Sequence, residues 1–131
     1  MIVVDTNVVA CLYLPTEFTS HAEALLERDP DWTAPPLWRS EFRDILAGYL
    51  RRKLLTFEAA TSLQAEAESL LAGAEHEVAS RQVLELVRDS NCSAYDCEFV
   101  ALAMNRGVRL VTMDAGILKA FPKVAVRLTA S

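Results

Sequence analysis

Two apolar stretches that each end in an aspartate decide the fold of this chain: Met1-Ile2-Val3-Val4-Asp5 and Val108-Arg109-Leu110-Val111-Thr112-Met113-Asp114. Short apolar runs bounded in this way are typical of buried strands. Helical patterns fill the chain between them, and strands that alternate with helices predict a parallel sheet covered on both faces. We therefore expect one α/β domain, residues 1–131, built as a three-layer α/β/α sandwich around a mostly parallel sheet of four to five strands.

Turn residues and hydrophobic periodicity divide the rest of the chain into short elements. Thr56 is a typical N-cap, and Gly107 stands where a helix ends. We expect further strands at residues 32–34, 75–78 and 124–128, the last of them at an edge of the sheet. We expect helices or helical turns at residues 8–12, 16–28, 35–53, 56–72, 80–90 and 93–105, and from Asp114 to about residue 120.

Composition indicates a packed domain, because 52% of the residues are hydrophobic and 24% are charged. The net charge of −5 argues against a protein that coats nucleic acid through general basicity, but it does not exclude a nuclease whose site is itself acidic. The three cysteines are irregularly spaced and are expected to be buried thiols in a reducing compartment. No apolar run approaches the roughly 20 residues of a membrane span, so we expect a cytoplasmic protein.

Asp5 and Asp114 are each the first acid after a buried strand. The carboxyl ends of parallel strands meet at the same edge of a sheet, where sites form. Neighbouring strands lie about 5 Å apart, so one metal ion could contact both aspartates if their strands are adjacent.

Two further acids fall on the apolar faces of expected helices. Glu41 lies four residues after Leu37 and four before Ile45, and therefore faces nearly the same way. Asp96 falls on the face of the helix that is expected to bury Tyr95, Phe99 and Val100. Asp44 and Glu98 are expected to point elsewhere. Acids held against buried surface repel one another and lose hydration, and a divalent cation is the natural compensation.

Each acid also has a purely structural interpretation. Asp5 and Asp114 could cap the helices that follow them, and Asp96 fits a capping box that begins at Ser93. Glu41 could pair with Arg52 or another base. Taken together, four acids directed at one edge of the sheet favour a common site over four separate accidents.

In these residues the chain resembles the PIN domains, and within them the VapC-type ribonuclease toxins. The resemblance spans nearly the whole chain and rests on residues 3–7, 40–42, 95–103 and 111–114, in that order and at that spacing. It implies a PIN-like α/β/α sandwich and a Mg²⁺ site, with Mn²⁺ as a substitute. It also implies hydrolysis of RNA phosphodiester bonds by activated water, leaving 5′-phosphate and 3′-hydroxyl ends.

Motif matching assigns roles to individual positions. The acidic catalytic set is Asp5, Glu41, Asp96 and Asp114, of which Asp5, Asp96 and Asp114 are the expected metal ligands. Thr6, Asn7 and Thr112 match polar positions that support the acids. The family also implies a homodimer and a cognate antitoxin that silences the toxin. The chain departs from many relatives at residues 115–117, where Ala-Gly-Ile replaces charged or polar residues.

Substrate contacts are harder to assign from the sequence. Arg39 and Arg43 flank Glu41 and are candidates for contact with RNA phosphates or with the antitoxin. Trp32 and Trp38 could stack on bases, or could belong to the core. His21 and His76 lie outside every motif and are interpreted as surface or structural residues. Apolar surface on the helices between residues 37 and 71 could serve a dimer, an antitoxin or ordinary core packing.

Three alternatives to the nuclease remain. The first is an aspartate-dependent phosphatase, although Asn7 stands where such enzymes need a second acid. The second is a catalytically inactive PIN-like module for RNA binding or assembly. The third is a structural α/β domain in which all the acids are caps, and it predicts no metal affinity.

Overall fold

The computed structural model describes residues 1–130, and Ser131, the last residue of the expected domain, lies outside the described residues. One parallel sheet forms the centre, with its strands in the order β2-β1-β3-β4. The strands are β1 (Ile2–Val4), β2 (Trp32–Thr33), β3 (Leu110–Thr112) and β4 (Ala125–Arg127). Every pairing is parallel, and β4 lies at an edge, so the expected sheet is confirmed with four strands.

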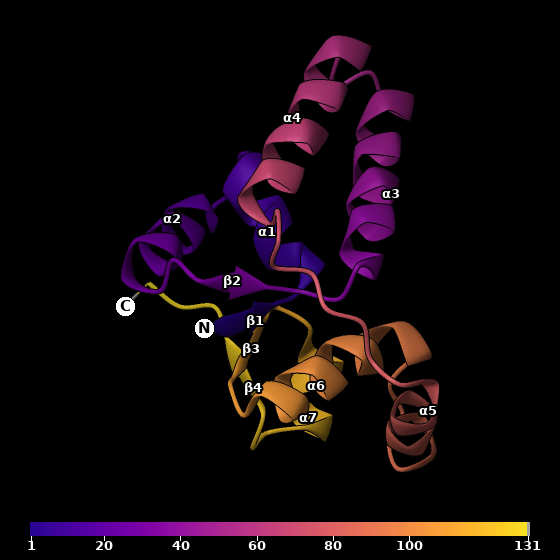
Figure 1. Cartoon of the computed structure of the whole chain (residues 1–131). Helices are drawn as coiled ribbons and strands as arrows, with labels where there is room; N and C mark the ends of the chain where they lie inside the picture. Colours follow the sequence, from indigo (N-terminus) through magenta and orange to yellow (C-terminus); the bar gives the residue numbers. More distant parts are fainter. Residues whose placement is uncertain (131) are drawn as a thin grey trace.

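Helices cover both faces of the sheet. In Figure 1, α1 and α2 lie on one side of it, whereas α6, α7 and α5 lie on the other, which confirms the expected three layers. The helices α3 and α4 form a hairpin that extends away from the sheet. Their bounds are α1 (Thr6–Tyr13), α2 (Thr19–Arg28), α3 (Leu37–Arg51), α4 (Phe57–Leu70), α5 (Ser80–Arg88), α6 (Ala94–Arg106) and α7 (Ala115–Ala120).

The core forms where the apolar strands meet the helices. Val3, Val4 and Leu110 on the central strands are fully buried. The helix α6 buries a continuous run, residues 99–103, because it packs against the central strands. Trp32 and Trp38 are both in the core, so their core interpretation is confirmed over base stacking. All three cysteines are free and buried, as expected.

Several local signals are confirmed. The Thr56 hydroxyl accepts a hydrogen bond from the backbone N–H of Ala59 at the start of α4. Gly107 ends α6 with a φ of 62°, a left-handed conformation that glycine adopts without a steric penalty. Within residues 1–130, no helix combines the length and the apolar character that crossing a membrane requires.

The strand expected at residues 75–78 is wrong. Glu75 forms one isolated bridge with Ala34, and the chain then continues without strand structure. The side chain of Glu75 accepts hydrogen bonds from Trp38 and Arg39 at the start of α3. These contacts and the bridge hold residue 75 at the edge of β2 without extending the sheet.

Candidate active site

Asp5 and Asp114 follow adjacent strands and lie at the same edge of the sheet. Asp5 follows β1 and Asp114 follows β3, and Val4 pairs directly with Val111. Both also cap a helix, because Asp5 accepts from the N–H of Thr6 at 2.8 Å and Asp114 from that of Ile117 at 2.9 Å. Both acids therefore act as helix caps, as their structural interpretation predicts. They also lie at the same edge of the sheet, so the capping role does not exclude a common site.

A cavity of about 590 Å³ lies at this edge, and all four predicted acids line it. Helix α3 contributes Glu41 from one side, and the first turn of α6 contributes Asp96 from another. The complete lining is Asp5, Thr6, Asn7, Leu37, Ser40, Glu41, Asp44, Ile45, Tyr95, Asp96 and Asp114. The fold thus gathers in one place side chains that are far apart in the sequence.

Thr6 and Thr112 fix the orientation of the buried acid Asp5. The Thr112 hydroxyl donates to Oδ2 of Asp5 at 2.7 Å, while the backbone N–H of Thr6 donates to Oδ1. The Thr6 hydroxyl donates in turn to Oε1 of Glu41 at 2.7 Å, so this residue links the end of β1 to α3. Both threonines are buried, which keeps competing water away from these bonds.

Asn7 joins the ends of the two central strands. Its Nδ2 lies 3.4 Å from Oδ2 of Asp5, and its Oδ1 accepts from the N–H of Met113 at 3.2 Å. The N–H of Asp114 donates to the Thr112 hydroxyl at 3.0 Å. The positions predicted to support the acids therefore contact them or the backbone beside them.

The acids raise one another's pKa values. Burial raises the pKa of Asp5 to about 6, against the lowering effect of hydrogen bonds from Thr112 and Thr6, and the charges of Glu41 and Asp96 raise it further. Burial also raises the pKa of Glu41, as does Asp96. The pKa of Asp96 is raised by burial and by Asp114, while hydrogen bonds from Ser93 oppose the rise. Ionising the whole set is therefore unfavourable without a compensating cation.

The donor chemistry suits a hard divalent cation, although the acids do not form a closed cage. Within the described part of the chain, no three histidine, cysteine or acidic side chains converge closely enough to hold a metal ion. Mg²⁺ is commonly held by one or two carboxylates and keeps several waters, so an open acidic cavity fits that ion. A direct role of Asp5, Asp96 and Asp114 together as ligands stays a prediction.

The structure corrects two expectations about orientation. Tyr95 is not buried: 62% of its side chain is exposed, and it lines the cavity beside Asp96. It lies in the first turn of α6, before the helix enters the core. Asp44 was expected to point elsewhere, but it also lines the cavity. It stands three residues after Glu41, a spacing that places two side chains on one face of a helix.

Arg39 and Arg43 are not brought to the cavity lining. The Arg39 guanidinium donates to both carboxylate oxygens of Glu75, at 2.6 and 2.8 Å, and to Glu68 at 3.1 Å. These bonds tie α3 to α4 and to the chain after α4, which is a structural role, and a contact of Arg39 with RNA or with the antitoxin stays a prediction. Arg43 is exposed. It stands two residues after Glu41 on the same helix, so its side chain faces away from the acids. His21 and His76 are half-buried and lie outside the lining.

Known proteins resemble this chain over nearly its whole length. The model of the PIN domain family matches residues 2–125. The curated protein Ribonuclease VapC3 of Pyrobaculum aerophilum is 29% identical over 124 residues, which cover 92% of this chain and 95% of that protein.

Solved structures show the same fold. FitAcB from Neisseria gonorrhoeae superposes with a TM-score of 0.73 at 19% identity, covering 99% of this chain and 98% of that one. FitAB bound to an IR36 DNA fragment gives 0.71 at 20% identity, with coverages of 97% and 94%. PAE2754 from Pyrobaculum aerophilum gives 0.71 at 18% identity, with coverages of 97% and 90%.

Proposed function

Because this chain belongs to the PIN domain family, we propose that it is a Mg²⁺-dependent endoribonuclease, with Mn²⁺ as a substitute cofactor. The observation that carries the proposal is the gathering of Asp5, Glu41, Asp96 and Asp114 in one cavity at the carboxyl edge of the sheet. The similarity to a protein named Ribonuclease VapC3 over most of both chains supports RNA as the substrate.

The acids Asp5, Asp96 and Asp114 would hold the cation. A bound Mg²⁺ would supply a nucleophile from water and offset the negative charge that develops on the phosphate. The part played by the chain is positional: Thr112 and Thr6 hold the two oxygens of Asp5, and the N-terminal turn of α7 holds Oδ1 of Asp114. Preorganised carboxylates need not rearrange when substrate binds.

Glu41 is suited to exchanging a proton. The Thr6 hydroxyl donates to its Oε1, and burial raises the pKa of the carboxyl above its ordinary value. A rise in the pKa of a carboxyl group favours its use as a general acid or base. Glu41→Gln should therefore lower kcat more than it raises KM, and unchanged kcat in this variant would remove Glu41 from the proton transfer.

Tyr95 offers a surface for a nucleobase. Its ring is largely exposed at the rim of the cavity, and Leu37 and Ile45 line the same space. Stacking of a base on an aromatic ring contributes about 1–3 kcal/mol. We expect Tyr95→Ala to raise KM for RNA while Tyr95→Phe keeps it near the wild-type value, and equal KM values for the two variants would contradict this role.

The test is cleavage of a mixed cellular RNA pool by the purified chain with Mg²⁺, with Mn²⁺ and with a chelator. The Asp96→Asn variant is assayed beside it. Discrete fragments that disappear with the chelator and with the variant are expected. Cleavage that persists in both would refute the proposal, and binding without cleavage would favour the inactive PIN-like module.

The stability of Asp96→Asn separates a site from a structural cap. If the acids form a site, removing one negative charge relieves repulsion, and the metal-free variant unfolds at the same or a higher temperature. If Asp96 serves only as part of a capping box, the variant should lose stability and should show no change in metal affinity.

We further propose that the chain is the toxin component of a toxin–antitoxin pair and forms a homodimer. The support is the resemblance to VapC-type toxins together with exposed apolar side chains at the end of the α3–α4 hairpin. Leu54 is 61% exposed there and Phe57 is 67% exposed. The molar mass of the wild type in solution, compared with that of Leu54→Ser/Phe57→Ser, tests the dimer; a monomeric wild type would exclude it.

A further inference from the structure

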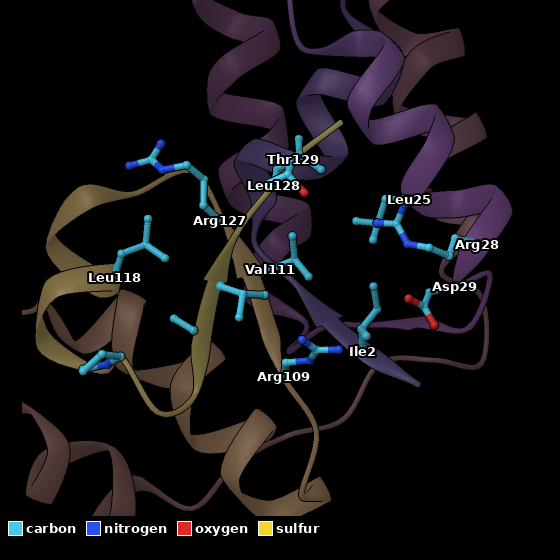
Figure 2. A pocket seen from close by; sticks show the side chains of 13 residues that line it. Ile2, Leu25, Arg28, Asp29, Arg109, Val111, Leu118, Arg127, Leu128 and Thr129 are labelled. Carbon is cyan, nitrogen blue, oxygen red and sulfur yellow. The ribbon is translucent and has the colours of Figure 1, made fainter. Parts of the chain in front are cut away.

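A second cavity lies on another part of the molecule, between α2 and the β3–β4 part of the sheet (Figure 2). Its volume is about 480 Å³. The apolar side chains of Ile2, Val111 and Leu118 form part of its lining. The acids of the candidate active site are absent from its lining, so the two cavities are separate.

Three arginines from three different elements surround this cavity: Arg28 at the end of α2, Arg109 before β3, and Arg127 on β4. Figure 2 shows Arg28 reaching from α2 towards the sheet and Arg109 below it beside Ile2, while the Arg127 side chain lies on the other side and extends outward past the edge of β4. Because they come from distant parts of the chain, the fold itself creates this group, which we call the arginine cavity.

The three guanidinium groups are exposed, and none of them forms a salt bridge with a residue of the described range 1–130. The salt bridges formed within residues 1–130 engage Arg39, Arg81, Arg88 and the N-terminal amine, and none of them engages these three arginines. Asp29 is the one acid in the lining, so the described side chains around the arginine cavity carry a net charge of +2. Like charges beside an apolar wall concentrate an electrostatic field and attract anions.

Basic side chains are also concentrated in the C-terminal part of the sequence. Residues 101–131 contain five of the 13 basic side chains and one of the 18 acidic ones, so this segment carries +4 in a chain of net charge −5. By contrast, the cavity lined by Asp5, Glu41, Asp96 and Asp114, which we call the acidic cavity, has no lysine or arginine in its lining. An RNA strand that reaches the acids must therefore find cations for its phosphates elsewhere on the surface.

We propose that the arginine cavity binds the phosphate backbone of the RNA strand beside the segment held at the acidic cavity, a proposal that rests on the endoribonuclease function. Arg127 pairs in register with Thr112, whose hydroxyl holds Asp5. Adjacent strands lie about 5 Å apart, so Arg127 is one strand away from the acidic edge, whereas Arg28 and Arg109 lie towards the amino end of the sheet, about 10 Å of strand further along the path proposed for the RNA. Arginine suits this role because its planar guanidinium matches phosphate oxygens in a bidentate arrangement.

The test is binding of a fluorescent single-stranded RNA 20-mer by the full chain, measured by anisotropy over a range of salt concentrations in a chelator, where no cleavage occurs. The variant is Arg28→Gln/Arg109→Gln/Arg127→Gln. Loss of three phosphate contacts should reduce the slope of log affinity against log salt by about 2, which corresponds to roughly 100-fold weaker binding at 0.1 M salt.

Matched variants separate a site from general charge. Arg51→Gln/Arg52→Gln/Lys53→Gln removes the same charge from an exposed region at the end of α3 and should leave the slope nearly unchanged. Arg28→Lys/Arg109→Lys/Arg127→Lys should keep the slope, and Asp29→Asn should tighten binding. The melting temperature of every variant is measured, and affinities are compared only among variants whose melting temperature matches that of the wild type. If the two glutamine triple variants lose affinity equally, the arginine cavity is not an RNA site.

Two further outcomes are decisive. A poly-glutamate peptide that binds as tightly as RNA and depends on the same arginines would assign the arginine cavity to an acidic protein segment and overturn the RNA proposal. Because binding is measured without metal, the result is independent of cleavage. A chain that binds RNA through the arginines but cleaves none would refute the nuclease function alone, whereas a chain that cleaves RNA with an unchanged salt slope would refute the arginine cavity alone.

Discussion

At the scale of single residues, Asp5 makes folding depend on pH. In the folded protein the pKa of its carboxyl is about 6, whereas its ordinary value is 3.8. Between these values the folded state holds the proton that the unfolded state has lost, so the free energy of unfolding falls as pH rises from about 4 to 6. The loss amounts to at most about 3 kcal/mol for this residue in metal-free protein.

Asp5→Asn should remove this dependence. The amide keeps an oxygen to accept from the N–H of Thr6 but carries no ionisable proton. Denaturant unfolding in a chelator at pH 5 and at pH 8 measures the effect. The wild type should lose clearly more stability between the two pH values than the variant does. Identical losses would show that folding does not raise the pKa of the Asp5 carboxyl.

Thr112 orients Asp5 through a single hydroxyl group. Thr112→Val keeps the shape of the side chain but removes the donor to Asp5 and the acceptor for the N–H of Asp114. Residues that orient metal-binding carboxylates typically affect activity by about 10- to 100-fold, and we expect a loss of this size in RNA cleavage. Thr112→Ser retains the hydroxyl and should retain most of the activity; if it fails as badly as valine, packing and not the hydrogen bond is responsible.

Single residues also show where sequence patterns are sufficient. Asp5 and Asp114 were predictable because strand ends fix the direction of the residue that follows. Asp44 was predictable in principle from its i+3 spacing to Glu41, whereas the exposure of Tyr95 depends on how far α6 extends beyond the core. The ion pair between Arg39 and Glu75 joins positions 36 residues apart, and no local pattern encodes a contact of that kind.

At the scale of secondary structure, the N-cap of α6 connects stability to the site. The Ser93 hydroxyl accepts from the N–H of Asp96 at 3.1 Å, so the cap fixes the turn that carries a catalytic candidate. Ser93→Ala should cost about 1 kcal/mol of stability and should also lower RNA cleavage, because the turn frays.

A second cap provides the control for this prediction. The Thr56 hydroxyl makes the equivalent bond to the N–H of Ala59 in α4, at 3.1 Å, and neither residue lines the acidic cavity. Thr56→Ala should lose a similar amount of stability by thermal unfolding without a matching loss of cleavage rate. Equal losses of activity in both variants would mean that the Ser93 cap acts only through global stability.

Elements with strong local signals were predicted well, and elements made by tertiary contact were not. Helix α6 has a capping serine, an apolar face and a terminal glycine, and its observed bounds differ from the expected ones by a single residue at each end. Residues 75–78 lack such signals: the apolar content that suggested a strand is slight, and Glu75 is fixed by side chains of α3.

At the scale of the whole molecule, the strand order explains why the site exists. Because β1 and β3 are neighbours in the sheet although more than 100 residues separate them in the chain, Asp5 and Asp114 emerge side by side. Helices α3 and α6 then deliver Glu41 and Asp96 to the same edge. The acids therefore repel one another in the folded state, and we expect the molecule to be more stable when a bound cation reduces this repulsion.

Mg²⁺ should therefore stabilise the whole molecule, and the effect should depend on pH. A ligand that binds only the folded state adds about 2.7 kcal/mol at 100 times its Kd. Protons compete with the cation for Asp5, whose pKa is about 6, so the stabilisation should be larger at pH 8 than at pH 5. Thermal unfolding with and without Mg²⁺ measures this stabilisation.

Two variants test where the cation binds. Glu27→Gln, which removes an exposed acid on α2, should respond to Mg²⁺ as the wild type does, whereas Asp96→Asn should lose most of the response. A response that is the same in all three proteins at both pH values would place the cation outside the acidic cavity, since only a site built from these carboxylates links the effect to both Asp96 and pH.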